Sequence, residues 1–197
     1  IPGFAYNLGF LLMNYSLYGL YVKPLPGYVP IAMSGNISFV VAIFTALVVI
    51  PLLYPSGQPF SKLGNILYKF AVGAITVGVL GILVTPGPVN EPEFMASNPF
   101  GIESAKSILE AIMGVVLLSL LALVLITAGT VIARIRKADP LTKKQLKYFI
   151  AGEAALVFVY LSDSFIQPIL PIWGPIAPLI AIPAIPLATY LILLREQ

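Results

Sequence analysis

Long apolar segments and short polar links alternate along the whole chain. An α-helix needs about 20 apolar residues to cross the hydrocarbon core of a bilayer, so each long segment is interpreted as one span. The run Val115–Ile126 is almost pure hydrocarbon, whereas residues 4–22 hold several tyrosines and asparagines. The pattern predicts an all-α fold, a polytopic membrane helix bundle that forms one domain over residues 1–197. Its six expected transmembrane helices are residues 4–22, 36–54, 66–85, 109–134, 147–166 and 175–194.

Turn and cap signals divide these segments. Pro51 and Pro55 are expected to stop the second helix, and residues 55–59 to form a turn after it. Asp139 followed by Pro140 is typical of a helix start, because a carboxylate can cap the first turn and proline fits the first helical position. The helix of the fifth span is therefore expected to begin there.

Glycine and proline also affect packing within the spans. Gly73, Gly78 and Gly81 lie in the third span, where a missing side chain permits a neighbouring helix to approach closely. The last span contains three prolines, each of which removes a backbone donor and should bend the helix. The expected kinks are at Pro178, Pro183 and Pro186.

Basic residues collect in the link between the fourth and fifth spans. They are Arg134, Arg136, Lys137, Lys143, Lys144 and Lys147. Only Asp139 opposes them there, and links rich in lysine and arginine stay in the cytoplasm. Alternation then predicts that both termini are cytoplasmic. The basic cluster is either a topology anchor that meets anionic lipid headgroups or a contact surface for a cytoplasmic partner.

The same alternation places the link Pro86–Ile108 outside. It carries Glu91, Glu93 and Glu103 against Lys106. Loops longer than about 12–15 residues are often functional, and this link exceeds that length. It is either a plain connection or a functional segment.

Composition agrees with a membrane location. Charged residues make up 10% of the chain and hydrophobic residues 59%, whereas soluble domains carry about 25% charged residues. No separate soluble domain fits, and the net charge of +3 is an asymmetry between links, so no nucleic-acid partner is expected. Because the chain begins with Ile1 and without an initiator Met, we expect it to be a piece of a longer protein.

Several chemistries are missing from the sequence. Cysteine and histidine are absent, which excludes disulfides, thiol nucleophiles, imidazole bases and histidine ligands for metals or haem. No phosphate-binding glycine loop of the Walker type occurs, and no lysine lies deep in a span, where retinal attachment would need one. We therefore expect no catalytic residue, no metal, no cofactor and no enzyme activity within this segment.

Two carboxylates lie in the fifth span and are candidate functional groups. A charge at membrane depth costs about 2.5–3.5 kcal/mol, so such residues are often functional. For Glu153 there is a structural interpretation, in which the carboxyl lies at the interface, pairs with Lys69 of the third span or is protonated, and a functional one. Asp163 has Ser162 and Ser164 as neighbours that could hydrogen-bond it. Ten residues separate the two carboxylates, which places them about 80° apart around a helix. A proton relay formed by this span alone is therefore not expected.

Four segments, in order, carry a resemblance to a known family. They are Leu52–Pro59, Asn98–Ile102, Ala138–Lys147 and the proline-rich ending Pro186–Arg195. Over about residues 40–197 the chain resembles the N-terminal multispan membrane module of bacterial sensor proteins, chiefly histidine-kinase-like proteins of actinobacterial and Chloroflexota type. The resemblance implies that a cytoplasmic signalling region follows Gln197, where any kinase motif would lie, and it implies no ligand.

The leading functional prediction is an integral sensor module of the inner (plasma) membrane. It would couple the membrane or the outer link to a cytoplasmic output through the fifth and sixth spans, with the proline kinks as a two-state element. One alternative is a non-catalytic accessory subunit of a larger membrane complex. The other is a small transporter or channel, which Glu153 and Asp163 alone support. Expected partners are the lipid bilayer and other membrane proteins or further copies of the chain.

Overall fold

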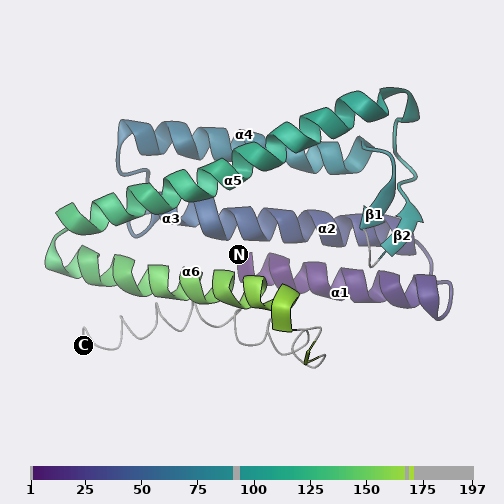
Figure 1. Ribbon diagram of the computed structural model, residues 1–197, viewed down its shortest axis with the longest axis horizontal. Coiled ribbons are helices and arrows are strands. Elements are labelled where there is room, and N and C mark those ends of the chain that lie inside the picture. Colours follow the sequence, from purple (N-terminus) through teal and green to yellow (C-terminus); the bar gives the residue numbers. More distant parts are fainter. Residues whose placement is uncertain (1, 91–93, 167–168, 171–197) are drawn as a thin grey trace. The chain divides into compact units, whose positions relative to one another are not determined.

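The computed structural model describes residues 2–90, 94–166 and 169–170 and is mainly helical (Figure 1). A π-helical segment, η1 (Thr45–Val49), joins α2 to α3, and a 3-10 turn, η2 (Glu103–Ala105), precedes α5. The six α-helices of the described residues are α1 (Pro2–Tyr21), α2 (Tyr28–Phe44), α3 (Ile50–Leu53), α4 (Lys62–Val84), α5 (Lys106–Lys137) and α6 (Pro140–Ile166). The helical prediction is confirmed in this part of the chain.

Three continuous helical stretches are long and apolar enough to cross a membrane: Tyr28–Leu53, Lys62–Val84 and Glu103–Lys137. They correspond to the second, third and fourth predicted spans and indicate a membrane protein. The first and fifth predicted spans are also helical, as α1 and α6. The sixth span, with its kinks at Pro178, Pro183 and Pro186, lies outside the described residues.

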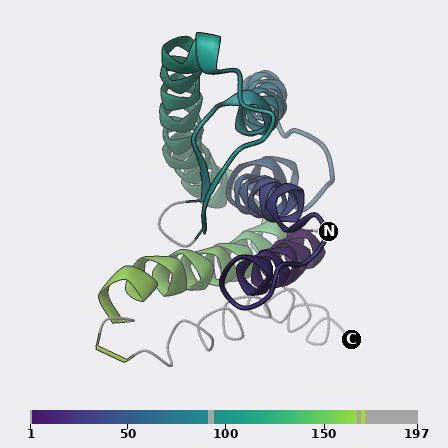
Figure 2. The same ribbon diagram turned by 90° about the vertical axis from the view of Figure 1, so that its right-hand side faces the viewer.

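The link between α4 and α5 contains a small β-hairpin that the sequence did not predict. Strands β1 (Pro88–Asn90) and β2 (Phe94–Ser97) pair antiparallel, with Pro88 opposite Ser97 and Asn90 opposite Phe94. Viewed end-on in Figure 2, the hairpin lies against the first turns of α2, in agreement with its contacts. The described residues of this link therefore form regular structure and not only a plain connection.

The second predicted span begins eight residues earlier than expected. Its helix starts at Tyr28, after Gly27 in a left-handed conformation with φ of 67°. Within it, the hydroxyls of Ser34 and Ser38 each donate to the carbonyl four residues earlier, at 3.0 and 2.8 Å. A serine that bonds its own helix in this way is tolerated inside it.

Pro51 does not itself stop this helix, because the helix continues to Leu53; it ends before Pro55, one residue short of the predicted end of the span at Tyr54. Proline has no N–H to donate, and its ring meets the carbonyl four residues earlier in a regular α-helix. The π-helical segment Thr45–Val49 lies directly before the proline and widens the helix at those carbonyls. The expected turn follows, with Gly57 at φ of 76° and its N–H donating to the Leu53 carbonyl at 2.8 Å.

Side chains cap the N-termini of α4 and α6. Asp139 Oδ1 accepts hydrogen bonds from the backbone N–H groups of Leu141 and Thr142, both at 3.1 Å, which confirms the predicted helix start. The hydroxyl of Ser61 accepts from Gly64 N at 2.9 Å, so α4 begins at Lys62, four residues before the predicted span.

The chain divides into two compact units, residues 1–52 with 59–127 and residues 53–58 with 128–197. The core of the first unit lies between the α2–α3 helix, α4 and α5. Its buried side chains are Phe44, Val48, Leu52, Ala71, Ile75, Leu120 and Leu123. In the second unit, Val131 of α5 and Leu146 and Phe149 of α6 are buried.

Glycines permit close helix packing within the first unit. A Cβ on Gly9 of α1 would lie 2.9 Å from the Gly35 carbonyl of α2, so the two backbones are nearly in contact. On α4, Gly81 faces Met113 and Gly78 faces Val116 of α5, as the sequence predicted. Gly73 differs, since nothing lies within 4 Å of its added Cβ.

Candidate functional site

Asn98 holds the link between α4 and α5 to the end of α4. Its side-chain Nδ2 donates to the carbonyls of Thr85 at 2.8 Å, Leu83 at 3.1 Å and Ile82 at 3.3 Å. Carbonyls at a helix C-terminus have no partner within the helix, so the amide supplies the hydrogen bonds that they lack. A single side chain thus fixes where the link leaves α4.

The residues after Asn98 complete this clamp. Its Oδ1 accepts a hydrogen bond from Phe100 N at 2.9 Å, and Ile102 N donates to the Val84 carbonyl at 2.9 Å. A Cβ on Gly101 would lie 2.5 Å from Pro86 Cα, so only glycine fits there without a shift. The segment Asn98–Ile102, which carries part of the family resemblance, therefore has a structural role in capping α4.

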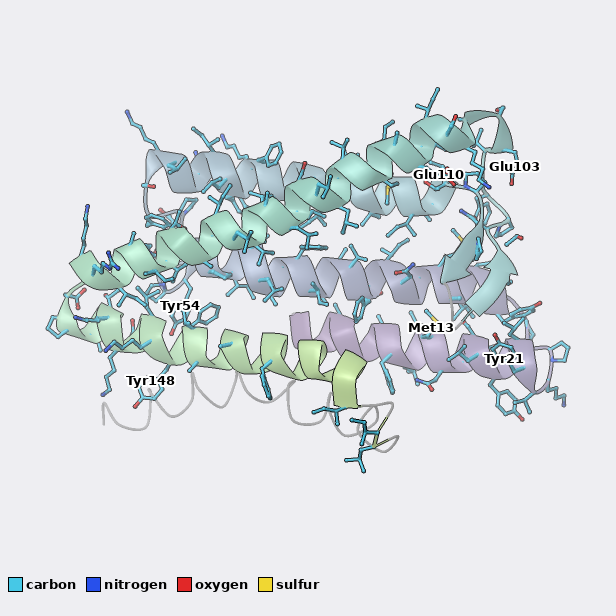
Figure 3. All side chains as sticks on the ribbon, viewed as in Figure 1. Met13, Tyr21, Tyr54, Glu103, Glu110 and Tyr148 are labelled. Atoms are coloured by element: carbon cyan, nitrogen blue, oxygen red, sulfur yellow. The ribbon has the colours of Figure 1, made fainter. Side chains whose placement is uncertain are left out.

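The hairpin packs on the first half of α2. Val89 of β1 is buried against Ala32 and Met33, and Met13 of α1 packs against the same cluster (Figure 3). Asn36 Nδ2 donates to the Val89 carbonyl at 3.1 Å, which ties α2 directly to the strand. The link between α4 and α5 and the helix Tyr28–Leu53 are therefore joined by both apolar and polar contacts.

A small cavity lies between the hairpin, α2, α4 and α5. Its volume is about 190 Å³, which admits a molecule of a few heavy atoms. The hydroxyl of Thr85, one of its lining residues, is buried and has no hydrogen-bond partner among the described residues. The lining is Met33, Asn36, Ile82, Thr85, Pro86, Pro88, Val89, Asn98 and Met113. A mostly apolar hollow with amide and hydroxyl groups is typical of a site for a small uncharged molecule.

Tyr54, directly after the helix Tyr28–Leu53, is held by two contacts in the second unit. Its carbonyl accepts a hydrogen bond from Arg134 Nη2 at 2.8 Å. Its ring stacks on that of Phe149 in α6, with 4.6 Å between centroids and 18° between planes (Figure 3). The Tyr54–Pro55 peptide is cis. Arg134, predicted to be part of a topology anchor, thus also fastens the turn at residues 53–58.

The remaining basic residues lie around the link between α5 and α6. Arg136 and Lys137 are exposed at the end of α5. Lys143, Lys144 and Lys147 line a groove of about 510 Å³ on α6, together with Pro140, Tyr148 and Ala151. Hydrogen bonds from the Thr142 side chain and the Thr142 backbone N–H hold the pKa of Asp139 below its ordinary value.

The candidate carboxylates and Lys69 lie on different helices. Lys69 is exposed on α4, whereas Glu153 and Asp163 lie on α6 with side chains outside the described residues. The pairing of Glu153 with Lys69 therefore stays a prediction. Within the described ranges, no group of acidic side chains could hold a metal ion.

Sequence reasoning missed Asn36, Tyr54 and Asn98 as site residues. Only Asn98 had a local signal, because asparagine followed by proline and glycine is typical of a turn that uses the Asn side chain. Comparisons with protein families, with curated proteins and with solved structures gave no match.

Proposed function

We propose that the chain is a signal-transducing sensor module of a bacterial inner membrane, with six spans and both termini in the cytoplasm. The outer link and the cavity beneath it receive the stimulus, and the turn at residues 53–58 passes it to α5 and α6. A cytoplasmic signalling region beyond Gln197 carries the output.

One observation carries this proposal: a single helix connects the two sites. Tyr28–Leu53 contacts the hairpin through Asn36 near its beginning and leads directly into Tyr54, which Arg134 and Phe149 hold. A displacement of the hairpin is therefore transmitted along one rigid element. The π-helical segment within this helix is of a kind frequently found at functional sites.

The charge pattern supports the orientation. Arg134 bonds the 53–58 turn, and the exposed lysines of α6 follow the end of α5. Basic links stay in the cytoplasm. The hairpin then faces outside, where an external molecule can reach the cavity.

Orientation is testable because the chain has no cysteine. Ser56→Cys and Ser104→Cys each introduce one exposed thiol, the first in the 53–58 turn and the second in η2. A membrane-impermeant maleimide added to intact cells should label Ser104→Cys and leave Ser56→Cys unlabelled until the membrane is opened. The reverse pattern would refute the proposed topology.

Coupling is tested separately with a spin label on Ser56→Cys in the reconstituted chain. Asn36→Leu removes the hydrogen bond to Val89 and should change the mobility of the label at the other end of the helix. Ser34→Ala, two residues away, removes only a bond within α2 and serves as the control. An unchanged spectrum in Asn36→Leu would contradict signal transfer and favour an accessory subunit.

A further inference from the structure

The groove on α6 presents three lysines on one face of the helix. Pro140, Lys143, Lys144, Lys147, Tyr148 and Ala151 line it. At 3.6 residues per turn these positions lie within about 140° of one another. Leu146 and Phe149, 0% and 2% exposed, lie on the opposite side and hold α6 in its unit. The lysine face is therefore not the face that packs.

Charge in this groove is not compensated by the described part of the chain. The ammonium groups of Lys143, Lys144 and Lys147 form no ion pair or hydrogen bond with any described residue. Asp139, four residues before Lys143, has its Oδ1 engaged by the backbone N–H groups of Leu141 and Thr142. Three ammonium groups around one hollow favour a phosphate-bearing occupant.

The same face becomes apolar further along α6. Ala151, Ala154 and Phe158 continue it, and Phe158 is 67% exposed. Eleven residues separate Lys147 from Phe158, or ~16 Å along the helix axis. This is close to half the ~30 Å thickness of the hydrocarbon core. A basic end and an apolar stretch of this length match one phospholipid leaflet.

We propose that this face of α6 is a binding site for an anionic phospholipid. The lipid phosphate lies among Lys143, Lys144 and Lys147, and an acyl chain runs along Ala151 and Ala154 to Phe158. The apolar continuation favours a lipid over free phosphate or an acidic peptide. The site depends on the membrane location of the chain and not on the proposed sensor function.

Native mass spectrometry of the purified chain in neutral detergent tests the site with phosphatidylglycerol as probe. The triple variant Lys143→Gln, Lys144→Gln, Lys147→Gln should lower the bound phosphatidylglycerol at least about tenfold, since each basic residue near the lipid contributes favourably. The matched control, Lys62→Gln, Lys69→Gln, Lys106→Gln, changes three exposed lysines elsewhere and should bind as the wild type does. Equal binding by both variants, or equal loss in both, would overturn the proposal.

Two further probes separate a lipid from phosphate alone. Phosphatidylcholine and millimolar inorganic phosphate should not displace bound phosphatidylglycerol, and Phe158→Gln should weaken its binding several-fold. Displacement by inorganic phosphate, with no effect of Phe158→Gln, would overturn the lipid assignment. If the triple variant does not fold, a photoreactive phosphatidylglycerol should label wild-type residues 148–158. Labelling confined to other helices would refute the site.

Discussion

The two ends of the helix Tyr28–Leu53 are fastened in different ways. Near its beginning, the link is held by amide side chains that bond backbone carbonyls, and a cavity of about 190 Å³ remains beside them. At its end, a cation and an aromatic stack hold Tyr54. The first end keeps space and the Thr85 hydroxyl, which has no partner among the described residues, and these features suit a ligand, whereas the contacts at the second end suit a firm attachment.

Loss of Asn98 should have the largest effect on this contrast. Asn98→Ala leaves the carbonyls of Ile82, Leu83 and Thr85 without the amide, and each unmet buried group costs about 1–3 kcal/mol. We expect a clear fall in the thermal midpoint of the detergent-solubilised chain. Asn14→Ala, which removes one exposed bond to Phe10, is the control and should change the midpoint little.

Removal of Arg134 should have the next largest effect. Arg134→Ala deprives the Tyr54 carbonyl of a charged donor, a hydrogen bond whose loss is expected to cost about 1–2 kcal/mol. Arg136→Ala, at the exposed end of α5, controls for the loss of charge and should alter the unfolding free energy only slightly. Equal destabilisation by both would mean that charge, and not the bond to Tyr54, fastens this end.

Thr85→Val, unlike the two preceding substitutions, is not expected to lower stability. It replaces a buried hydroxyl without a described partner by a methyl group of the same shape, which should leave stability unchanged or raise it by up to about 1 kcal/mol. The thermal midpoint measures this. A marked loss of stability would show that the hydroxyl makes a necessary contact, and the cavity beside the hairpin would then be a less suitable binding site.

The smallest expected effect concerns Asp139. Its folded-state pKa lies below the ordinary 3.8, so the carboxylate contributes stability that is present above that value. This contribution is lost as the pH falls through the folded-state pKa. The thermal midpoints of the wild type and Asp139→Asn, measured from pH 6 to pH 2.5, should therefore converge at the acidic end. A difference that stays constant with pH would exclude the carboxylate as its cause.

Much of the helical framework could be predicted from hydrophobic pattern alone. The run Val115–Ile126 lies within α5, and the cap at Asp139 depends only on neighbouring residues. The hairpin could not be predicted in this way, because Val89 of β1 packs against α2 and Asn98, directly after β2, bonds the C-terminal end of α4. These contacts join residues far apart in sequence, and no local period records them.

At Pro51, a local sequence rule did not predict where the helix ends. Pro51 was expected to end a helix on local rules, yet the helix continues because the backbone before it takes a wider path. The choice between a break and a π turn depends on packing, here of Val48 and Leu52 in the core of the first unit. The stack of Tyr54 on Phe149 was likewise invisible to sequence patterns, since almost a hundred positions separate the two rings.

The π turn at Thr45–Val49 also constrains the number of residues between Asn36 and Tyr54. Each residue of an α-helix advances the azimuth of the chain by about 100°, and a π turn accommodates one residue more than an α turn. Deleting a single residue there would restore a regular helix and leave Tyr54 at nearly the same azimuth relative to Asn36, whereas a deletion elsewhere in the helix would rotate Tyr54 by about 100°. The spacing between these two residues is thus a phase relationship, and a one-residue insertion or deletion outside Thr45–Val49 would disturb it more than most substitutions.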